Sequence, residues 1–204
     1  MSNNMGIREQ KWHTELNKTF SISFWEKARQ LCASIIYENP LKWLQFQVIR
    51  NSLQTNKIVS HFIRNVGPEC QYCQLTFETI SHLYWLCPVV SHFLNESFNF
   101  ICSSGLNFKP TREQFIFGFL NESFNTPSNY LVLWLKKFIW KNKFKNEINL
   151  SVAGFKNYLL FVLRDLKKIY NLKNKPAQFS EWNDLFILLE ADNHEDHRHG
   201  PQVP

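Results

Sequence analysis

Apolar residues recur at helical spacing along most of the chain. A Ser23-x-x-Glu26 capping-box pattern predicts the start of a first helix, which we expect to end near Asn39. Asn39-Pro40 predicts the start of a second helix, and because its apolar residues cover much of its surface we expect it to be buried on more than one side. Thr55 can cap a third helix.

The second half of the chain keeps the helical period. We expect a helix at residues 89–102 and a short apolar segment at residues 115–120. Thr126 and Ser151 supply cap signals for two long amphipathic helices. A last apolar segment, residues 182–189, precedes an acidic, His-containing tail that we expect to be disordered. The pattern predicts a mainly α fold.

The composition supports a folded helical protein. Aromatic residues make up 16% of the 204 residues, and the 6 Gly and 8 Pro supply few turns for an all-β fold. No uncharged apolar run approaches the roughly 18 residues of a membrane span, and the chain does not start with the apolar region of a signal peptide. We therefore expect an intracellular protein, nuclear or cytoplasmic, that is not secreted and does not bind a membrane.

The positive charge is concentrated in one block. The formal net charge is +6, yet residues 131–170 carry nine Lys/Arg against two Asp/Glu, whereas the last 25 residues carry one Arg against six acids. A basic block of this kind favours an anionic partner, above all nucleic acid. The alternative is a solvated surface of lysine-rich helices.

Three of the five cysteines and one histidine fall within residues 67–88, GPECQYCQLTFETISHLYWLCP, which we call the finger. Their order is Cys70, Cys73, His82 and Cys87, with the spacing Cys-x2-Cys-x8-His-x4-Cys. Three thiolates and one imidazole form the tetrahedral ligand set of a structural zinc site, with no coordination position left for a catalytic water. We therefore predict one structural Zn2+ and a helical domain organised around a short Cys-Cys-His-Cys zinc finger.

The expected local structure brings the ligands together in two steps. A turn before the first cysteine lets the paired cysteines converge, and a helix capped by Thr76, with Glu78 in its first turn, carries His82. Cys87 follows His82 by five positions, about 140° further round an ideal helix. Both side chains can reach one metal only if the last turn loosens, and Pro88 favours this by biasing Cys87 out of the α region.

Two other interpretations of the cysteines stay open. The four side chains could fall together by chance and serve as ordinary buried or surface residues. They could also form a disulfide, although a reducing compartment favours thiolates that bind zinc over thiols that pair.

Basic residues both precede and follow the finger. Those before it could bind phosphate, or they could balance the zinc site, whose net charge is about −1 with three thiolates and a neutral His. Lysines spaced four residues apart in the basic block form a row on one helix face. The candidate nucleic-acid-binding residues are Arg50, Lys57, Arg64, Lys136, Lys137, Lys141, Lys143, Lys145, Lys167 and Lys168.

WLQFQVIRNSLQTNKIVSHF, followed by CQYC and ETISHLYWLC, resembles the zinc-binding region C-terminal to the reverse transcriptase of non-LTR (LINE-type) retrotransposon polyproteins. The resemblance extends in kind over residues 23–170 and implies that the four finger residues are zinc ligands. It also implies a role in holding element RNA or target DNA, with a reverse transcriptase body as a partner. The sequence lacks the paired aspartates of a polymerase, so the resemblance implies no polymerase activity.

We expect four regions along the chain. They are a polar N-terminal segment (1–22), helices plus the finger (23–102), a basic helical region (103–170), and a short apolar segment with the acidic tail (171–204). The expected function is that of a non-catalytic, zinc-binding and nucleic-acid-binding accessory domain without a small-molecule substrate. One alternative is a protein-interaction module that docks its basic helices on an acidic partner or on the polymerase body. Another is a hydrolase or nuclease, which would need an open metal position.

Overall fold

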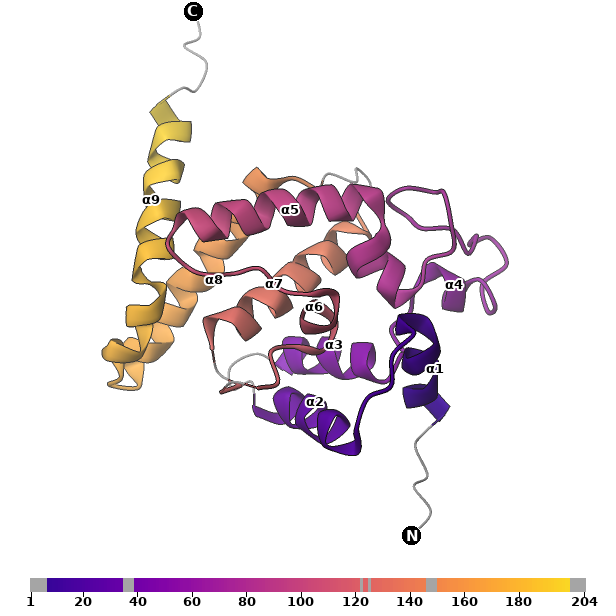
Figure 1. Cartoon of the computed structure of the whole chain (residues 1–204). Coiled ribbons are helices and arrows are strands. Elements are labelled where there is room, and N and C mark those ends of the chain that lie inside the picture. The colour runs from indigo at the N-terminus through magenta and orange to yellow at the C-terminus, as the bar shows by residue number, and fades with distance from the viewer. Residues whose placement is uncertain (1–6, 35–38, 122, 125, 146–149, 199–204) are drawn as a thin grey trace, which may run out of the picture. The chain divides into compact units, whose positions relative to one another are not determined.

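The computed structural model describes residues 7–34, 39–121, 123–124, 126–145 and 150–198 (Figure 1). The described residues form no β-strand, only an isolated bridge between Glu69 and Phe77, so the mainly α fold is confirmed. None of the described helices is both long and apolar enough to cross a membrane. The helices are α1 Ile7–Leu16, α2 Ile22–Ser34, α3 Asn39–Ile49, α4 Asn56–Val59, η1 His82–Leu86, α5 Pro88–Ser103, α6 Arg112–Phe117, α7 Pro127–Asn142, α8 Val152–Leu172, η2 Pro176–Trp182 and α9 Asn183–Arg198.

The chain divides into two compact units. Unit 1 comprises Met1–His92 and Pro110–Ile148, and unit 2 comprises Phe93–Lys109 and Asn149–Pro204. The finger lies in unit 1 together with α1 to α4, α6 and α7, whereas α8, η2 and α9 lie in unit 2. Each unit is described by itself below.

An aromatic cluster anchors α1 in the core of unit 1. The indole of Trp12 is fully buried, and its Nε1–H donates to Ile49 O at 2.9 Å. Its ring meets Phe117 edge-on with 5.2 Å between centroids, and Trp25 meets the same ring at 5.5 Å. Residues 7–16, which the sequence places in a polar N-terminal segment, therefore form a helix that contributes to the core.

Helix α7 packs against α3 within unit 1. Thr126 caps α7 as predicted, with its Oγ1 accepting from Asn129 N at 3.5 Å. Six consecutive side chains, residues 130–135, are buried, so α7 is surrounded by protein along its first half and is not a one-sided amphipathic helix. The first predicted helix is α2, which ends at Ser34; residues 35–38, where we expected it to continue, lie outside the described residues.

Unit 2 is built on the amphipathic helix α8. Ser151 caps it as predicted, because its Oγ accepts from Gly154 N at 3.1 Å. Its buried stripe includes Phe155, Leu159 and Leu163, the first of which meets Phe93 of α5 edge-on at 5.9 Å. The apolar residues that recur at helical spacing along α8 thus form part of the core of this unit, as predicted.

The acidic end of the chain differs from the prediction. Residues 190–198 continue α9 and are not a disordered tail, whereas residues 199–204 lie outside the described residues. Lys156 Nζ of α8 lies 2.6 Å from Asp192 Oδ2, and Arg164 lies 3.5 Å from Glu190 Oε1. Part of the basic face of α8 is therefore already paired with carboxylates of its own unit.

Candidate metal centre

The first half of the finger is a tight turn that carries two of the cysteines. Cys70 N donates to Thr76 O at 2.8 Å, and Gln74 N donates to Cys70 O at 2.9 Å, which closes the loop around Cys73. Gln74 has φ 54°, in the left-handed region that reverses the chain direction. This turn brings the two sulfur atoms within 4.8 Å of each other.

The second half is a π-helix. His82–Leu86 form a single wide turn, and Cys87 N donates to His82 O at 2.8 Å, five residues back. Such a turn is wider than an α turn, so ligands five positions apart approach each other. Cys87 itself is extended before Pro88, as predicted, with φ −64° and ψ 123°. The helix begins at Ile80, later than the expected cap at Thr76, because the preceding residues pair with the chain before the cysteines.

The four predicted ligands converge on one point. Their ligand atoms all lie within 4.8 Å of one another and could hold a metal ion. Cys70 Sγ lies 3.8 Å from Cys87 Sγ, and Cys73 Sγ lies 3.3 Å from His82 Nε2. Tetrahedral zinc with Zn–S bonds of about 2.3 Å places its sulfurs about 3.8 Å apart, so the observed spacing fits that ion.

The cluster is enclosed by protein. The cysteines at positions 70 and 87 are fully buried, His82 is 7% exposed, and Cys73 is half-buried. All five cysteines are free thiols, so the disulfide interpretation does not describe this cluster. An ion at its centre would have four protein ligands, the complete set of a tetrahedral site.

A hydrogen bond joins the sulfur atoms of the two buried cysteines, Cys70 and Cys87. The hydrogen bond between their sulfurs holds the pKa of Cys70 at about 5 against the opposing effect of burial, and backbone N–H groups add to the lowering. The same hydrogen bond and burial raise the pKa of Cys87. One thiolate is therefore present at neutral pH, and a cation that binds displaces the shared proton.

Glu78 connects the finger to the helices around it. Its buried carboxylate accepts from Gln71 N at 3.0 Å and from Asn56 N, at the start of α4, at 2.8 Å. It also pairs with the Lys143 ammonium, and the two side chains are 0% and 3% exposed. The sequence pattern places Glu78 in the first turn of a helix, and only the tertiary structure reveals its role in supporting the cysteine turn.

Tyr72 makes a second connection between the finger and α7. Its hydroxyl donates to Ile139 O at 2.5 Å. Burial raises the pKa of Tyr72, so the phenol keeps the proton that it donates. Because Tyr72 stands between two of the metal ligands, this contact fixes their turn against α7.

Most of the cations predicted to bind nucleic acid in unit 1 are at the surface. Lys137 is half-buried. The exposed ones are Arg50, Lys57, Arg64, Lys141 and Lys145.

The structure corrects the prediction for Lys136 and Lys143, which are buried and unavailable to phosphate. Lys143 pairs with the carboxylate of Glu78. Lys136 Nζ donates to Gln45 Oε1 and, at 3.0 Å, to Ile116 O. Both corrections have one cause: α7 is enclosed by unit 1, so lysines on its inner side must find partners within the core.

In unit 2, Lys167 and Lys168 are exposed but engaged locally. The Lys167 ammonium lies over the rings of Phe179 and Phe186, at 5.6 and 4.5 Å from their centroids. Lys168 lies 3.3 Å from Asp165, three residues earlier on α8. Both lysines therefore have partners within their own unit, a carboxylate for Lys168 and two aromatic rings for Lys167.

Comparison with known proteins finds no protein family, no curated protein and no solved structure that matches this chain. The helical fold and the four-residue cluster are therefore the observations from which a function is argued.

Proposed function

We propose that the chain is a non-catalytic helical domain that holds one structural Zn2+ in its finger and binds nucleic acid, RNA or DNA, through cations of unit 1. The observation that carries the metal proposal is the convergence of four ligand atoms within 4.8 Å. Three thiolates and one imidazole suit zinc better than harder cations. An intracellular, reducing location would keep the thiols available.

The role of this zinc would be mechanical. The ion would join the cysteine turn at one end of the finger to the π-helix at the other, across a segment with few buried apolar residues of its own. With four protein ligands the ion has no position for a substrate, which disfavours a hydrolase or nuclease mechanism at this site. Metal binding would then contribute directly to the folding free energy of the segment.

Metal analysis of the purified full chain tests the zinc proposal. We expect one zinc per chain in the wild type, loss of that zinc in Cys73→Ser, and a lower thermal midpoint after treatment with a strong chelator. Cys102→Ser is the matched control, because Cys102 lies in unit 2 with its Sγ 3.4 Å from Phe108 O. Zinc retained by Cys73→Ser, or a midpoint indifferent to the chelator, would contradict the proposal.

The support for nucleic-acid binding is the distribution of charge in unit 1. Residues 39–68 and 123–146 contain no Asp or Glu. The exposed cations within these segments are therefore not interleaved with carboxylates, which favours a polyanionic partner. The resemblance to the region that follows LINE-type reverse transcriptases agrees with this role and suggests a reverse transcriptase body as a further partner.

A salt titration tests the electrostatic part. The affinity of the wild type for an oligonucleotide should fall linearly with salt on a log–log scale, and Lys141→Glu/Lys145→Glu should weaken binding and flatten the slope. Lys175→Glu, at an exposed position in unit 2, controls for an ordinary change of charge. Affinity that is independent of salt would refute the electrostatic account.

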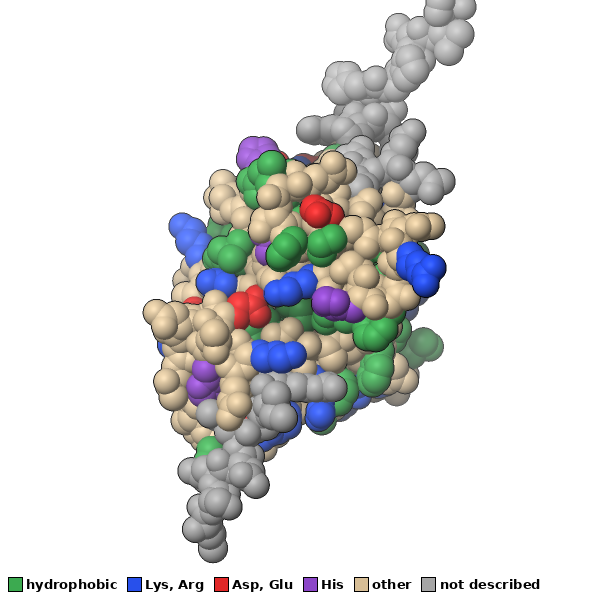
Figure 2. Space-filling model, turned by 90° about the vertical axis from the view of Figure 1, so that its right-hand side faces the viewer, with side chains coloured by type: hydrophobic (Ala, Val, Ile, Leu, Met, Phe, Trp, Pro, Cys, Tyr) green, Lys and Arg blue, Asp and Glu red, His purple; other side chains and the backbone are tan. Residues whose placement is uncertain are grey.

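One observation favours the protein-interaction alternative. Large apolar side chains in the finger and just before it are exposed, with Phe62 at 83%, Leu75 at 78% and Phe77 at 55%. Figure 2 shows hydrophobic side chains interspersed with Lys and Arg on the face that lies to the right in Figure 1. If the full chain binds neither single nor double strands at low salt, this alternative becomes the better account.

A further inference from the structure

An aromatic pair stands on the outer face of α3, where the sequence suggests burial. Trp43 is 61% exposed and Phe46 is 37% exposed. Their rings are stacked, with 5.5 Å between centroids and 20° between planes. Spaced three residues apart, they occupy one helix face, and water covers a large part of both rings. Both side chains are exposed, so this pair is available to a ligand.

Cations border the aromatic pair on α3. The Arg50 guanidinium lies over the Phe46 ring, 5.4 Å from its centroid, in a cation–π contact, and the side chain is exposed. Lys42 adjoins Trp43 in sequence. Lys42 is half-buried, so an anionic group beside the rings would meet positive charge mainly at the Arg50 end of the pair.

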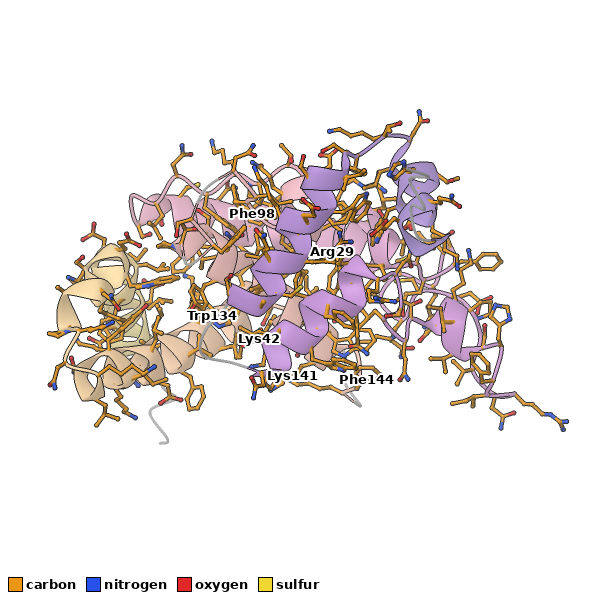
Figure 3. All side chains as sticks on the ribbon, turned by 90° about the horizontal axis from the view of Figure 1, so that it is seen from below. Arg29, Lys42, Phe98, Trp134, Lys141 and Phe144 are labelled. Carbon is orange, nitrogen blue, oxygen red and sulfur yellow. The ribbon has the colours of Figure 1, made fainter. Side chains whose placement is uncertain are left out.

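The end of α7 carries a further exposed ring and cation. Helices α3 and α7 pack together in unit 1, and in the view of Figure 3, from below, Lys42, Lys141 and Phe144 lie on the side of the molecule that α3 occupies. Phe144 is 63% exposed and Lys141 is exposed. The surface therefore combines three exposed rings with cations, in segments that contain no carboxylate.

We propose that this aromatic surface, formed by Trp43, Phe46, Arg50, Lys141 and Phe144, binds single-stranded nucleic acid by stacking unpaired bases on its rings. The inference rests on the proposed nucleic-acid binding and adds the strandedness of the ligand and the place of contact. Exposed rings next to cations are how proteins hold single strands, since every base has a π face and the cations follow the phosphates. In a duplex the base faces are stacked on one another and cannot reach the rings.

The test compares a labelled oligonucleotide of mixed sequence, as a single strand and as a duplex, by fluorescence anisotropy with the zinc-loaded full chain. We expect Trp43→Ala to weaken single-strand binding by about 5- to 140-fold, the value of one lost stacking contact. Duplex binding and the salt slope should not change, because stacking releases no counterions. Trp43→Phe keeps a π face and should retain most of the affinity.

Phe161→Ala is the matched control, because Phe161 is an aromatic side chain of α8 with 64% exposure. It should leave single-strand binding unchanged. Equal binding of single strand and duplex, with no effect of Trp43→Ala, would overturn this inference and leave the proposed function standing. A wild type that binds neither strand would overturn both. Trp43→Ala could instead change only the self-association of the chain, measured by sedimentation. The surface would then be an interface between copies, and the inference would also fall.

Discussion

Replacing Lys136 by Met should remove the rise of stability with pH that this one buried lysine contributes between neutral and alkaline conditions. The ammonium of Lys136 is fully buried in unit 1, where its hydrogen bonds go to the uncharged oxygens of Gln45 and Ile116. Desolvation lowers the pKa of Lys136 from 10.5 to about 7, and the charge interaction with Cys32 acts in the opposite direction. The folded protein therefore releases this proton far more readily than the unfolded chain does.

The magnitude follows from linkage. A pKa that falls from 10.5 to about 7 corresponds to about 5 kcal/mol, at about 1.4 kcal/mol per unit. Below pH 7 both states bind the proton and the full cost of the buried charge is present. Between the two pKa values only the unfolded chain keeps the proton, so the free energy of unfolding rises with pH across this window and levels off above 10.5.

The substitution also has a cost that does not depend on pH. Met leaves Gln45 Oε1 without its ammonium donor, which costs about 1–3 kcal/mol, while Ile116 O keeps the bond from Gln45 Nε2 at 3.1 Å. Because this loss is the same at every pH, it does not affect how the difference in stability between the two proteins changes with pH. The free energy of unfolding of the wild type minus that of Lys136→Met should therefore increase by several kcal/mol from pH 6 to pH 10, about the size of the linkage effect.

Urea denaturation at a series of pH values, followed by tryptophan fluorescence, measures this difference. Lys141→Met removes the same charge from an exposed position and controls for the loss of a cation. Stability curves of the wild type and Lys136→Met that run parallel from pH 6 to pH 10 would refute the reasoning, since they would show that the folded protein does not release the proton.

Two further predictions concern single contacts in unit 1. Lys143→Met leaves the buried carboxylate of Glu78 without its counter-ion and should lower the free energy of unfolding, measured by urea denaturation, by about 3–5 kcal/mol. The double variant Lys143→Met/Glu78→Gln should restore part of this loss. Wild-type stability of the single variant would argue against a buried ion pair. Thr111→Ala removes a complete capping box on α6, where Gln114 N donates to Thr111 Oγ1 at 3.2 Å and Thr111 N donates to Gln114 Oε1 at 2.8 Å. Thr111→Ala should lower the free energy of unfolding by about 1 kcal/mol. This loss should exceed that of Thr126→Ala, because the cap bond of Thr126 is 3.5 Å long. A lower thermal midpoint for Thr126→Ala than for Thr111→Ala would contradict this account.

The features that the sequence predicts well depend on local chemistry. Thr126 and Ser151 cap α7 and α8 because a hydroxyl next to a helical pattern acts on the backbone within three residues. The four predicted metal ligands converge as expected for the same reason, since a turn and a loosened helix end lie within one short segment. Even the loosening before Pro88 follows from the restriction that proline places on the preceding residue.

The features that the sequence does not predict depend on distant partners. Lys136 and Lys137 are adjacent in a basic block, yet one is buried and the other half-buried, because α3 and α6 lie over one side of α7. Glu78 stays out of the helix, since its N–H donates to Pro68 O at 2.9 Å and its carboxylate meets Lys143, 65 residues away. Contacts between residues this far apart in the chain leave no periodic pattern in the sequence.

The π turn between His82 and Cys87 makes the length of this segment as important as its residues. Deleting one residue there would favour an ordinary α turn and swing the terminal sulfur about 100° around the axis, away from the other three ligands. Side chains that face water, such as Leu86 at 53% exposure, are free to vary. Homologous sequences that keep the metal should therefore differ here by substitution and not by insertion or deletion.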